Sequence, residues 1–313
     1  MKIVVYTDGK PPAAAALRFA AVLSERLSAE LGVLTVRSGT HATESPPPLG
    51  VALPRQGWST LPEGMRILTG AADMLGDMGF LRSLLSIKVR EVPSGYLFVA
   101  STVAGLKVPF FEHYGDLIEV LNEEVAEHRS DLVVIASPPK DRVGRLLGGD
   151  TARGLALHLQ TSLLVVREGG LDGRFLVCAD GSPSARRLFP LLKQLLPGIG
   201  GRVDVMFVHV PGTPQAEIDK GNQCVEKARA WLDGCGKPGE LLRPEGTSSA
   251  KVIVETAGDH SVVVMAATLR HDLHHRLKGS LPLKVLRETR STVLLVKVPP
   301  EADMDFFRDP MTC

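Results

Sequence analysis

The chain has 313 residues, enough for two domains of ordinary size. Hydrophobic residues make up 44% and charged residues 23%, which excludes an intrinsically disordered protein. Lys and Arg number 36 against 35 Asp and Glu, so no strong net charge points to nucleic acid or to an acidic membrane surface. No apolar window is long enough for a membrane span, and the N-terminus becomes polar too early for a signal peptide. Four cysteines are too few for a disulfide scaffold, and we expect a cytoplasmic protein.

The first half of the chain alternates apolar runs with helical patterns. It opens with a predicted strand over Lys2–Tyr6, and a helical pattern follows over Ala13–Leu31. The segment 38–62 is rich in proline, and we expect a surface loop there. Residues 94–113 hold two β-leaning runs, which predict a hairpin added to the basic unit. An amphipathic helix is predicted over Asp116–Arg129.

The second half repeats this alternation with shorter connections. A predicted strand over Arg174–Cys178 is followed by a predicted helix over Ala185–Leu196. Val203–Val210 is predicted to be the second strand. Further helices are expected over Ala216–Leu232 and Ser249–Ala257.

The spacing of these elements indicates that the two halves are copies of one unit. The first strands end in Asp8-Gly9 and in Asp180-Gly181. Later apolar runs end at Ala136 and Ala266, and in each half a glycine follows after the same spacing of thirteen residues. A last apolar run then begins after a further spacing that is again equal in both halves. Chance rarely preserves two such spacings, so we infer an internal repeat.

The pattern predicts an α/β fold with two open, mostly parallel five-stranded sheets flanked by helices. Runs such as Val262–Met265 are apolar at every position, as strands covered on both faces must be. We expect a first domain over 1–169, which carries the insertion. A second domain over 170–300 and a C-terminal tail over 301–313 complete the chain.

The last strand of each copy would leave an exposed sheet edge. These strands are predicted over Ser162–Arg167 and Thr292–Val298. An exposed apolar edge invites pairing or aggregation.

A candidate ligand site lies at the carboxyl ends of the strands of the second copy, where open parallel sheets bind ligands. Asp180 follows the first strand, and a loop with three Lys or Arg residues and three His residues leads from Ala266 to Gly279-Ser280. A glycine and a hydroxyl at a helix start can bind phosphate through backbone N–H groups and the helix dipole. The competing interpretation is that Ser280 only caps a helix beside a solvated basic loop.

Other chemistry-bearing residues give weaker signals. His271, His274 and His275 could share a helix face, but no cysteine or carboxylate cluster supports a metal, and we expect none. His209 is interpreted as a satisfied core histidine and Cys178 as a small core residue. The chain contains no nucleophile-elbow or P-loop motif, so no catalytic residue is expected.

Three segments of the second copy resemble the universal stress protein family. They are Asp180–Ala185 after the first strand, Val208–Val210 at the end of the second and Gly279-Ser280 before the last helix. The resemblance covers residues 1–168 and 172–298, so the chain resembles a tandem of two such domains. It implies an adenine nucleotide α-hydrolase-like fold. Members of the family pair through their last strand, so the resemblance also implies that the two last strands of this chain pair antiparallel about a pseudo-twofold axis and form an intramolecular pseudodimer. A homo-oligomer would then use another surface, such as 94–113.

The resemblance also implies a nucleotide site in the second copy. Nucleotide-binding members of the family carry Gly-x2-Gly-x9-Gly-Ser/Thr, with an Asp after the first strand and a backbone contact after the second. The implied site residues here are Asp180, Val210, Ala266, Leu269, Gly279 and Ser280. The two opening glycines are replaced by residues whose Cβ obstructs the approach of backbone to phosphate, so we expect weak or no binding of ATP.

The first copy matches this pattern less well. Asp8 and Val36 are retained at the ends of its first two strands. The motif positions are Ala136, Pro139, Gly149 and Asp150. Proline has no N–H to donate, and a carboxylate repels phosphate, so we expect no nucleotide in this copy.

Two functions remain open. The first is a stress-response protein that binds ATP or another adenine nucleotide in its second domain through the degenerate loop. The alternative is an interaction or scaffold protein in which both pockets are degenerate. In either case we expect no enzyme, with weak nucleotide hydrolysis as the upper limit, and no nucleic-acid or membrane partner.

Overall fold

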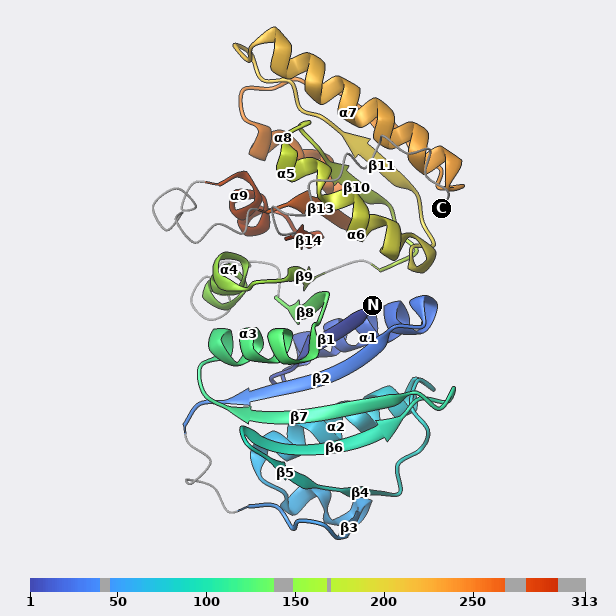
Figure 1. Cartoon of the computed structure of the whole chain (residues 1–313), viewed down its shortest axis with the longest axis vertical. Coiled ribbons are helices and arrows are strands. Elements are labelled where there is room, and N and C mark those ends of the chain that lie inside the picture. Colours follow the sequence, from blue (N-terminus) through green and yellow to red (C-terminus); the bar gives the residue numbers. More distant parts are fainter. Residues whose placement is uncertain (40–45, 138–148, 168–169, 268–279, 298–313) are drawn as a thin grey trace. The chain divides into compact units, whose positions relative to one another are not determined.

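The chain folds into two compact units, Met1–Ser137 and Pro138–Cys313 (Figure 1). The computed structural model describes residues 1–39, 46–137, 149–167, 170–267 and 280–297. Each unit has a mostly parallel sheet flanked by helices, which confirms the predicted α/β class. Within these described ranges, no helix combines the length and apolarity needed to cross a membrane.

The first unit is built on a sheet with the strand order β8-β1-β2-β7-β6-β5. Its elements are β1 (Lys2–Tyr6), α1 (Pro11–Leu27), β2 (Glu30–Arg37), β3 (Ala52–Pro54), η1 (Arg55–Thr60), α2 (Glu63–Asp77), β4 (Ser86–Lys88), β5 (Arg90–Val92), β6 (Gly95–Ser101), β7 (Lys107–Tyr114), α3 (Leu117–His128) and β8 (Leu132–Ala136). The strands β8, β1, β2 and β7 run parallel, whereas β7, β6 and β5 are antiparallel neighbours. The short strands β3 and β4 pair in a separate antiparallel sheet.

Local sequence explains where the helices of this unit begin and end. Pro11 stands in the first turn of α1, where a missing N–H costs nothing, and the helix ends at Ser28 in the left-handed conformation. Asp116 caps α3, because its Oδ1 accepts hydrogen bonds from the backbone N–H groups of Ile118 and Glu119. The chain thus enters and leaves the sheet at defined points.

The insertion in the first unit differs from the expectation in two ways. The segment 38–62, predicted to be a surface loop, contains β3 and η1, where Trp58 is buried. The predicted hairpin over 94–113 is confirmed as the antiparallel pair β6–β7. However, β7 also pairs parallel with β2, as the third strand of the basic unit does. The strands added to the basic unit are therefore β3, β4, β5 and β6. Which strands belong to the basic unit is thus decided by pairing between distant segments.

The second unit has the strand order β12-β11-β10-β13-β14-β9. Its elements are α4 (Gly149–His158), β9 (Ser162–Val166), β10 (Phe175–Cys178), α5 (Pro183–Arg186), α6 (Leu188–Leu195), η3 (Leu196–Gly198), β11 (Val203–Met206), α7 (Gln215–Gly234), β12 (Leu241–Leu242), α8 (Ser249–Thr256), η4 (Ala257–Asp259), β13 (Val262–Ala266), α9 (Leu281–Glu288) and β14 (Thr292–Val296). The five neighbouring strands β12, β11, β10, β13 and β14 run parallel, and β9 is antiparallel to β14.

The predicted antiparallel pairing of the two last strands is confirmed. Val293 lies opposite Val165 and Leu295 opposite Leu163 in the register of β14 and β9. Lys297 reinforces this junction, because its Nζ donates to the backbone oxygen of Leu159 at 2.7 Å at the end of α4. The pseudo-twofold axis remains a prediction.

The same pairing corrects the predicted strand count. Helix α4 and strand β9 come from the first sequence copy, yet they pack in the second compact unit. Among the described strands, the sheet within each unit therefore has six members and not five. The apolar, fully buried β9 finds its partner in β14, and this contact decides the unit to which it belongs.

Two elements of the second unit are shorter than predicted. The predicted helix over Ala185–Leu196 is divided into α5 and α6 at Arg187. The second strand ends at Met206 and not at Val210, because beyond it only an isolated bridge from His209 to Glu245 continues the pairing. The predicted helices over 216–232 and 249–257 correspond to α7 and α8.

Candidate functional site

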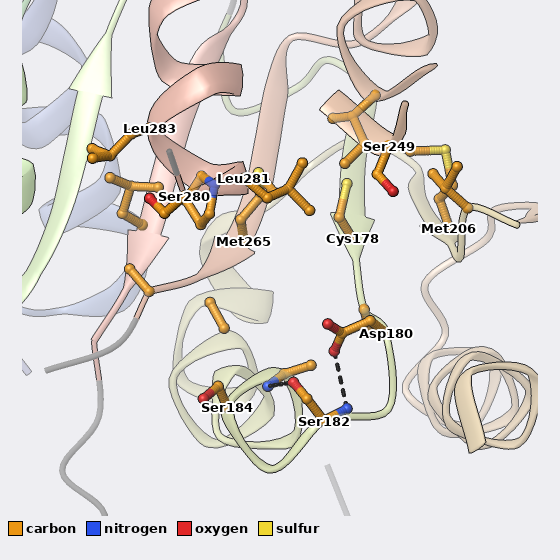
Figure 2. A pocket seen from close by; sticks show the side chains of 18 of the residues that line it. Cys178, Asp180, Ser182, Ser184, Met206, Ser249, Met265, Ser280, Leu281 and Leu283 are labelled. Carbon is orange, nitrogen blue, oxygen red and sulfur yellow. Dashed lines mark hydrogen bonds between the residues drawn. The ribbon is translucent and has the colours of Figure 1, made fainter. Parts of the chain in front are cut away.

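A cavity of about 280 Å³ lies in the second unit, at the carboxyl ends of β10 and β13 and the start of α9 (Figure 2). Its position is the one at which open parallel sheets bind ligands. Most of its lining is apolar, with a few polar side chains. The residues that line it are Ala156, Cys178, Ala179, Asp180, Ser182, Ser184, Ala185, Met206, Phe207, Val208, Ser249, Ile253, Met265, Ala266, Ala267, Ser280, Leu281, Pro282, Leu283 and Leu295.

The floor of the cavity is a row of side chains across four neighbouring strands. Cys178 lies in register with Met206 on one side and Met265 on the other, and Met265 is in turn paired with Leu295. Figure 2 shows Cys178 between Met206 and Met265. Burial raises the pKa of the Cys178 thiol to about 12, so the thiol is neutral at physiological pH. The floor is apolar and polarisable, a surface that suits a flat ring.

Polar groups gather at the end of β10. The backbone N–H of Ser182 donates to Asp180 Oδ1 at 2.9 Å, and Ser182 Oγ accepts from the backbone N–H of Ala185 at 3.1 Å (Figure 2). The second carboxylate oxygen of Asp180 forms no hydrogen bond or ion pair with any described residue. Asp180 is exposed and thus has an oxygen available for a ligand hydroxyl.

The turn that carries Asp180 requires glycine at position 181. Gly181 has a φ of +74°, and a Cβ built on it would lie 2.5 Å from the backbone oxygen of Lys220. Both the left-handed backbone and the close approach of α7 exclude a side chain there. The Asp-Gly pair seen in the sequence is therefore a structural requirement of the rim.

The start of α9 forms another side of the cavity. Ser280 is the N-cap residue in an extended conformation, and its side chain makes no capping hydrogen bond. Its hydroxyl and the positive end of the helix dipole can attract an anion. Pro282 in the first turn has no N–H, which reduces the number of donors available at this end.

Three of the six predicted site residues come together at this cavity. Asp180, Ala266 and Ser280 all line it. Val210 lies beyond the end of β11 and is not among the lining residues, so its predicted backbone contact stays a prediction. Leu269 and Gly279 lie outside the described residues, as do His271, His274 and His275. Across the described ranges, no group of His, Cys, Asp or Glu suits a metal ion.

The sequence interpretation missed the floor. Cys178, interpreted as a small core residue, lines the cavity together with Met206 and Met265. The sequence did hold one indication: Cys178 stands two residues before Asp180, which makes it the last residue of strand β10. His209 is hydrogen-bonded, with its Nε2 3.1 Å from Asn222 Oδ1, but it is only half-buried.

The equivalent corner of the first unit is built from different side chains. Tyr6 stands two residues before Asp8, as Cys178 does before Asp180, and Leu34 is its partner in β2. Burial, with a smaller contribution from Asp8, raises the pKa of Tyr6 to about 12. Asp8 has both oxygens engaged by Lys10, with the backbone N–H at 3.0 Å and Nζ at 3.0 Å. The carboxylate oxygen that is free on Asp180 is thus engaged on Asp8.

One family model matches more than half of the chain. The model of the universal stress protein family matches residues 1–167. The structure of a universal stress protein from Archaeoglobus fulgidus DSM 4304 superposes with a TM-score of 0.61 at 16% identity, covering 95% of this chain and 98% of that one. A functionally unknown protein from Pseudomonas aeruginosa PAO1 gives 0.61 at 16% identity, covering 96% and 94%. At these identities the structural likeness shows the fold alone. No curated protein matches the chain.

Proposed function

Because the chain belongs to the universal stress protein family, we propose that it acts in the stress response as a non-catalytic protein that binds an adenine nucleotide in the cavity of its second unit. One observation carries this proposal. Asp180, Ala266 and Ser280, three positions that the family pattern assigns to nucleotide contact, line one cavity although they come from distant segments. Any hydrolysis of the nucleotide would be weak.

Each part of the cavity suits one part of such a ligand. The row of Met206, Cys178 and Met265 offers a flat apolar surface to the adenine ring. The free oxygen of Asp180 can accept a hydrogen bond from a ribose hydroxyl. Ser280 and the start of α9 face the phosphate side. The backbone of Val210 and the loop residues Leu269 and Gly279 complete the proposed site.

The same geometry argues for modest affinity. A cavity of about 280 Å³ is at the small end of ligand pockets, which typically begin near about 300 Å³. Ala266 carries a Cβ where the pattern has glycine, and Pro282 cannot donate to phosphate. We therefore expect ATP to bind weakly, and restoring glycine at positions 266 and 269 should tighten its binding.

Calorimetric titration of the full chain with ATP, ADP and AMP tests the proposal. Ser280→Asp places a carboxylate beside the phosphates and should abolish binding. Thr151→Asp makes the same charge change on exposed α4 and should leave binding unchanged. Protein that purifies with stoichiometric ATP would contradict the expected weak affinity. Binding that is lost on Asp8→Ala and retained on Asp180→Ala would place the site in the first unit and overturn the assignment.

A second function has its own support in the first unit. Within the described parts of the chain, all the large hydrophobic side chains that are strongly exposed fall between Leu49 and Leu106. Such a concentration is typical of a protein-interaction surface. The alternative is therefore an interaction or scaffold protein with two degenerate pockets. Absence of any nucleotide effect in the titrations would favour it.

The remaining assignments belong to the same proposal. They are a cytoplasmic location, repeat domains over 1–169 and 170–300 with a tail over 301–313, and an intramolecular pseudodimer of the two copies. Sedimentation of the full chain measures whether it stays monomeric, as a self-contained pseudodimer should. A stable dimer at micromolar concentration would show that further assembly occurs.

A further inference from the structure

The middle of the hairpin β6–β7, Tyr96–Ala100 and 108–111, is apolar on both faces. Tyr96, Phe98 and Phe110 point to one face and are buried, and α2 packs on this side of β7 (Figure 1). A strand with one face open to water ordinarily alternates apolar and polar residues, whereas a strand covered on both sides is apolar throughout. The middle of the two strands therefore has the pattern of strands covered on both sides.

The second face of this hairpin is continuous and partly exposed. Val99 lies directly opposite Pro109, and Leu97 directly opposite Phe111, so all four side chains share one face. Val99 is 37% exposed, and the other three are half-buried. We call these four residues the outer hairpin face. It is an apolar surface for which the described chain provides no complete cover.

Two exposed cations border the outer hairpin face. Arg90 lies opposite Leu97 in the neighbouring strand β5, and Lys107 lies opposite Ser101 in β7. Both cations are exposed, and neither forms an ion pair with any residue that the structure describes. A partner that covers the face would bring its own charges close to these two groups. Carboxylates are the complementary choice.

Helix α3 packs next to the outer hairpin face, beside Phe111. Its His128 ring lies 5.5 Å from the ring of Phe111. The helix buries an apolar side and exposes Glu119, Glu123 and Glu127. An acidic amphipathic helix therefore already packs beside Phe111, and a second helix of this type would extend the layer over Val99.

We propose that the outer hairpin face binds an acidic amphipathic helix of another protein. The apolar side of the helix covers Leu97, Val99, Pro109 and Phe111, and its carboxylates pair with Arg90 and Lys107. A second copy of this chain is a poorer occupant, because pairing the same face twice brings four cations together. The surface does not depend on the nucleotide site, so either proposal can fail without the other.

Methyl NMR spectra of the full chain test this proposal with two synthetic peptides. Both peptides have the same leucine-rich helical face, and one carries Glu at the positions where the other carries Lys. The Glu peptide should shift the methyl signals of Leu97 and Val99, and the Lys peptide should not. Val99→Lys should weaken binding of the Glu peptide about tenfold or more.

Val103→Lys is the matched control. Val103 is 60% exposed in the turn between β6 and β7, outside the outer hairpin face, so the change should leave peptide binding intact. Equal binding of both peptides, or shifts away from β6 and β7, would overturn the proposal. Self-association lost on Val99→Lys would assign the face to a second copy instead. Binding to phosphatidylglycerol vesicles that Val99→Lys removes would assign it to a membrane surface.

Discussion

The two units place different side chains at the same corner of the same fold. In the second unit, Cys178 lies on the floor of a cavity and Asp180 keeps one oxygen free. In the first unit, Tyr6 stands at the position of Cys178, and Lys10 engages both oxygens of Asp8. The strand order near this corner is the same in both. The same backbone arrangement can therefore carry a corner with a free carboxylate oxygen or one whose carboxylate is fully engaged, through a few side chains at the strand ends.

The units also differ in their buried polar groups. Asp204, which is fully buried in β11, accepts hydrogen bonds from Arg174 Nε at 3.0 Å and from the backbone N–H of Glu240 at 2.7 Å, and His260 Nε2 lies 2.8 Å away. Burial alone would raise the pKa of Asp204, but these hydrogen bonds hold it below its usual value. The equivalent position in the first unit is Gly32. Only the second unit has this network among the described residues.

The largest expected effect is the fall in stability of the second unit when this network is removed. Asp204→Ala leaves Arg174 and His260 without their buried partner and should lower the free energy of unfolding of the second unit by about 3–5 kcal/mol. Trp231 lies in this unit and Trp58 in the other, so fluorescence of Trp231 in a Trp58→Phe background follows the second unit alone.

A carboxylate of the first unit provides the matched control. Asp116→Ala removes the exposed cap of α3 and should cost about 1 kcal/mol in that unit. Equal losses for Asp204→Ala and Asp116→Ala would show that the buried network contributes no more than a helix cap.

The next effect concerns the ligand site. Cys178→Tyr introduces the residue of the first unit and should fill the cavity, lowering nucleotide affinity by about a hundredfold, equivalent to about 2.7 kcal/mol. Calorimetric titration measures the change. Cys224→Ala alters the other described free thiol, which does not line the cavity, and should leave affinity unchanged. Unaltered affinity in Cys178→Tyr would place the ligand elsewhere.

A smaller difference is expected between the stabilities of alanine variants at the two Asp-Gly turns. Gly181→Ala places a Cβ on a residue with a φ of +74°, at 2.5 Å from the backbone oxygen of Lys220. We expect it to lower the free energy of unfolding by about 1–2 kcal/mol. Gly9→Ala has a similar φ of +72°, but its Cβ would meet the flexible side chain of Ile67 at 2.9 Å. Its cost should be smaller. Denaturant unfolding of both variants gives the order, and a reversed order would contradict the geometry.

The smallest effect is on the pH dependence of stability. Burial, with a smaller contribution from Glu127, raises the pKa of Glu124 in α3 from 4.5 to about 7. The folded first unit then binds more protons than the unfolded chain, so stability is fully present below about pH 4.5 and is lost as the pH rises through 7. Glu124→Gln should remove this loss. Trp58 fluorescence during urea unfolding at pH 5 and 8 measures it.

Lys297 gives the opposite slope in the second unit. Burial lowers its pKa from 10.5 to about 8, so the folded unit releases a proton earlier than the unfolded chain. Stability should therefore rise between pH 8 and 10.5, and Lys297→Met should abolish the rise. The same slope in both units would contradict the assignment of these two groups.

Part of the site could be predicted from sequence because its signals are local. The Asp-Gly pair, the apolar runs and the Gly-Ser pair are short patterns with fixed spacing, and they predicted Asp180, Ala266 and Ser280 as neighbours. The floor escaped prediction because Met206 and Met265 join Cys178 only through strand register. The end of β11 at Met206 was also misjudged, because apolar character continues along the chain beyond the end of the regular strand.

By itself the sequence determined the α/β class, the internal repeat, the family and the pairing of the last two strands. The class and the repeat follow from composition, periodicity and spacing, whereas the family and the strand pairing follow from short motifs that resemble those of known proteins. Only the tertiary structure decided that α4 and β9 pack in the second unit and that β7 is the third strand of the first unit. It also decided that Cys178 lines a cavity, whereas Tyr6 stands at the equivalent position of the first unit. Each of these depends on contacts between residues far apart in sequence, where packing selects among partners that local patterns leave equivalent.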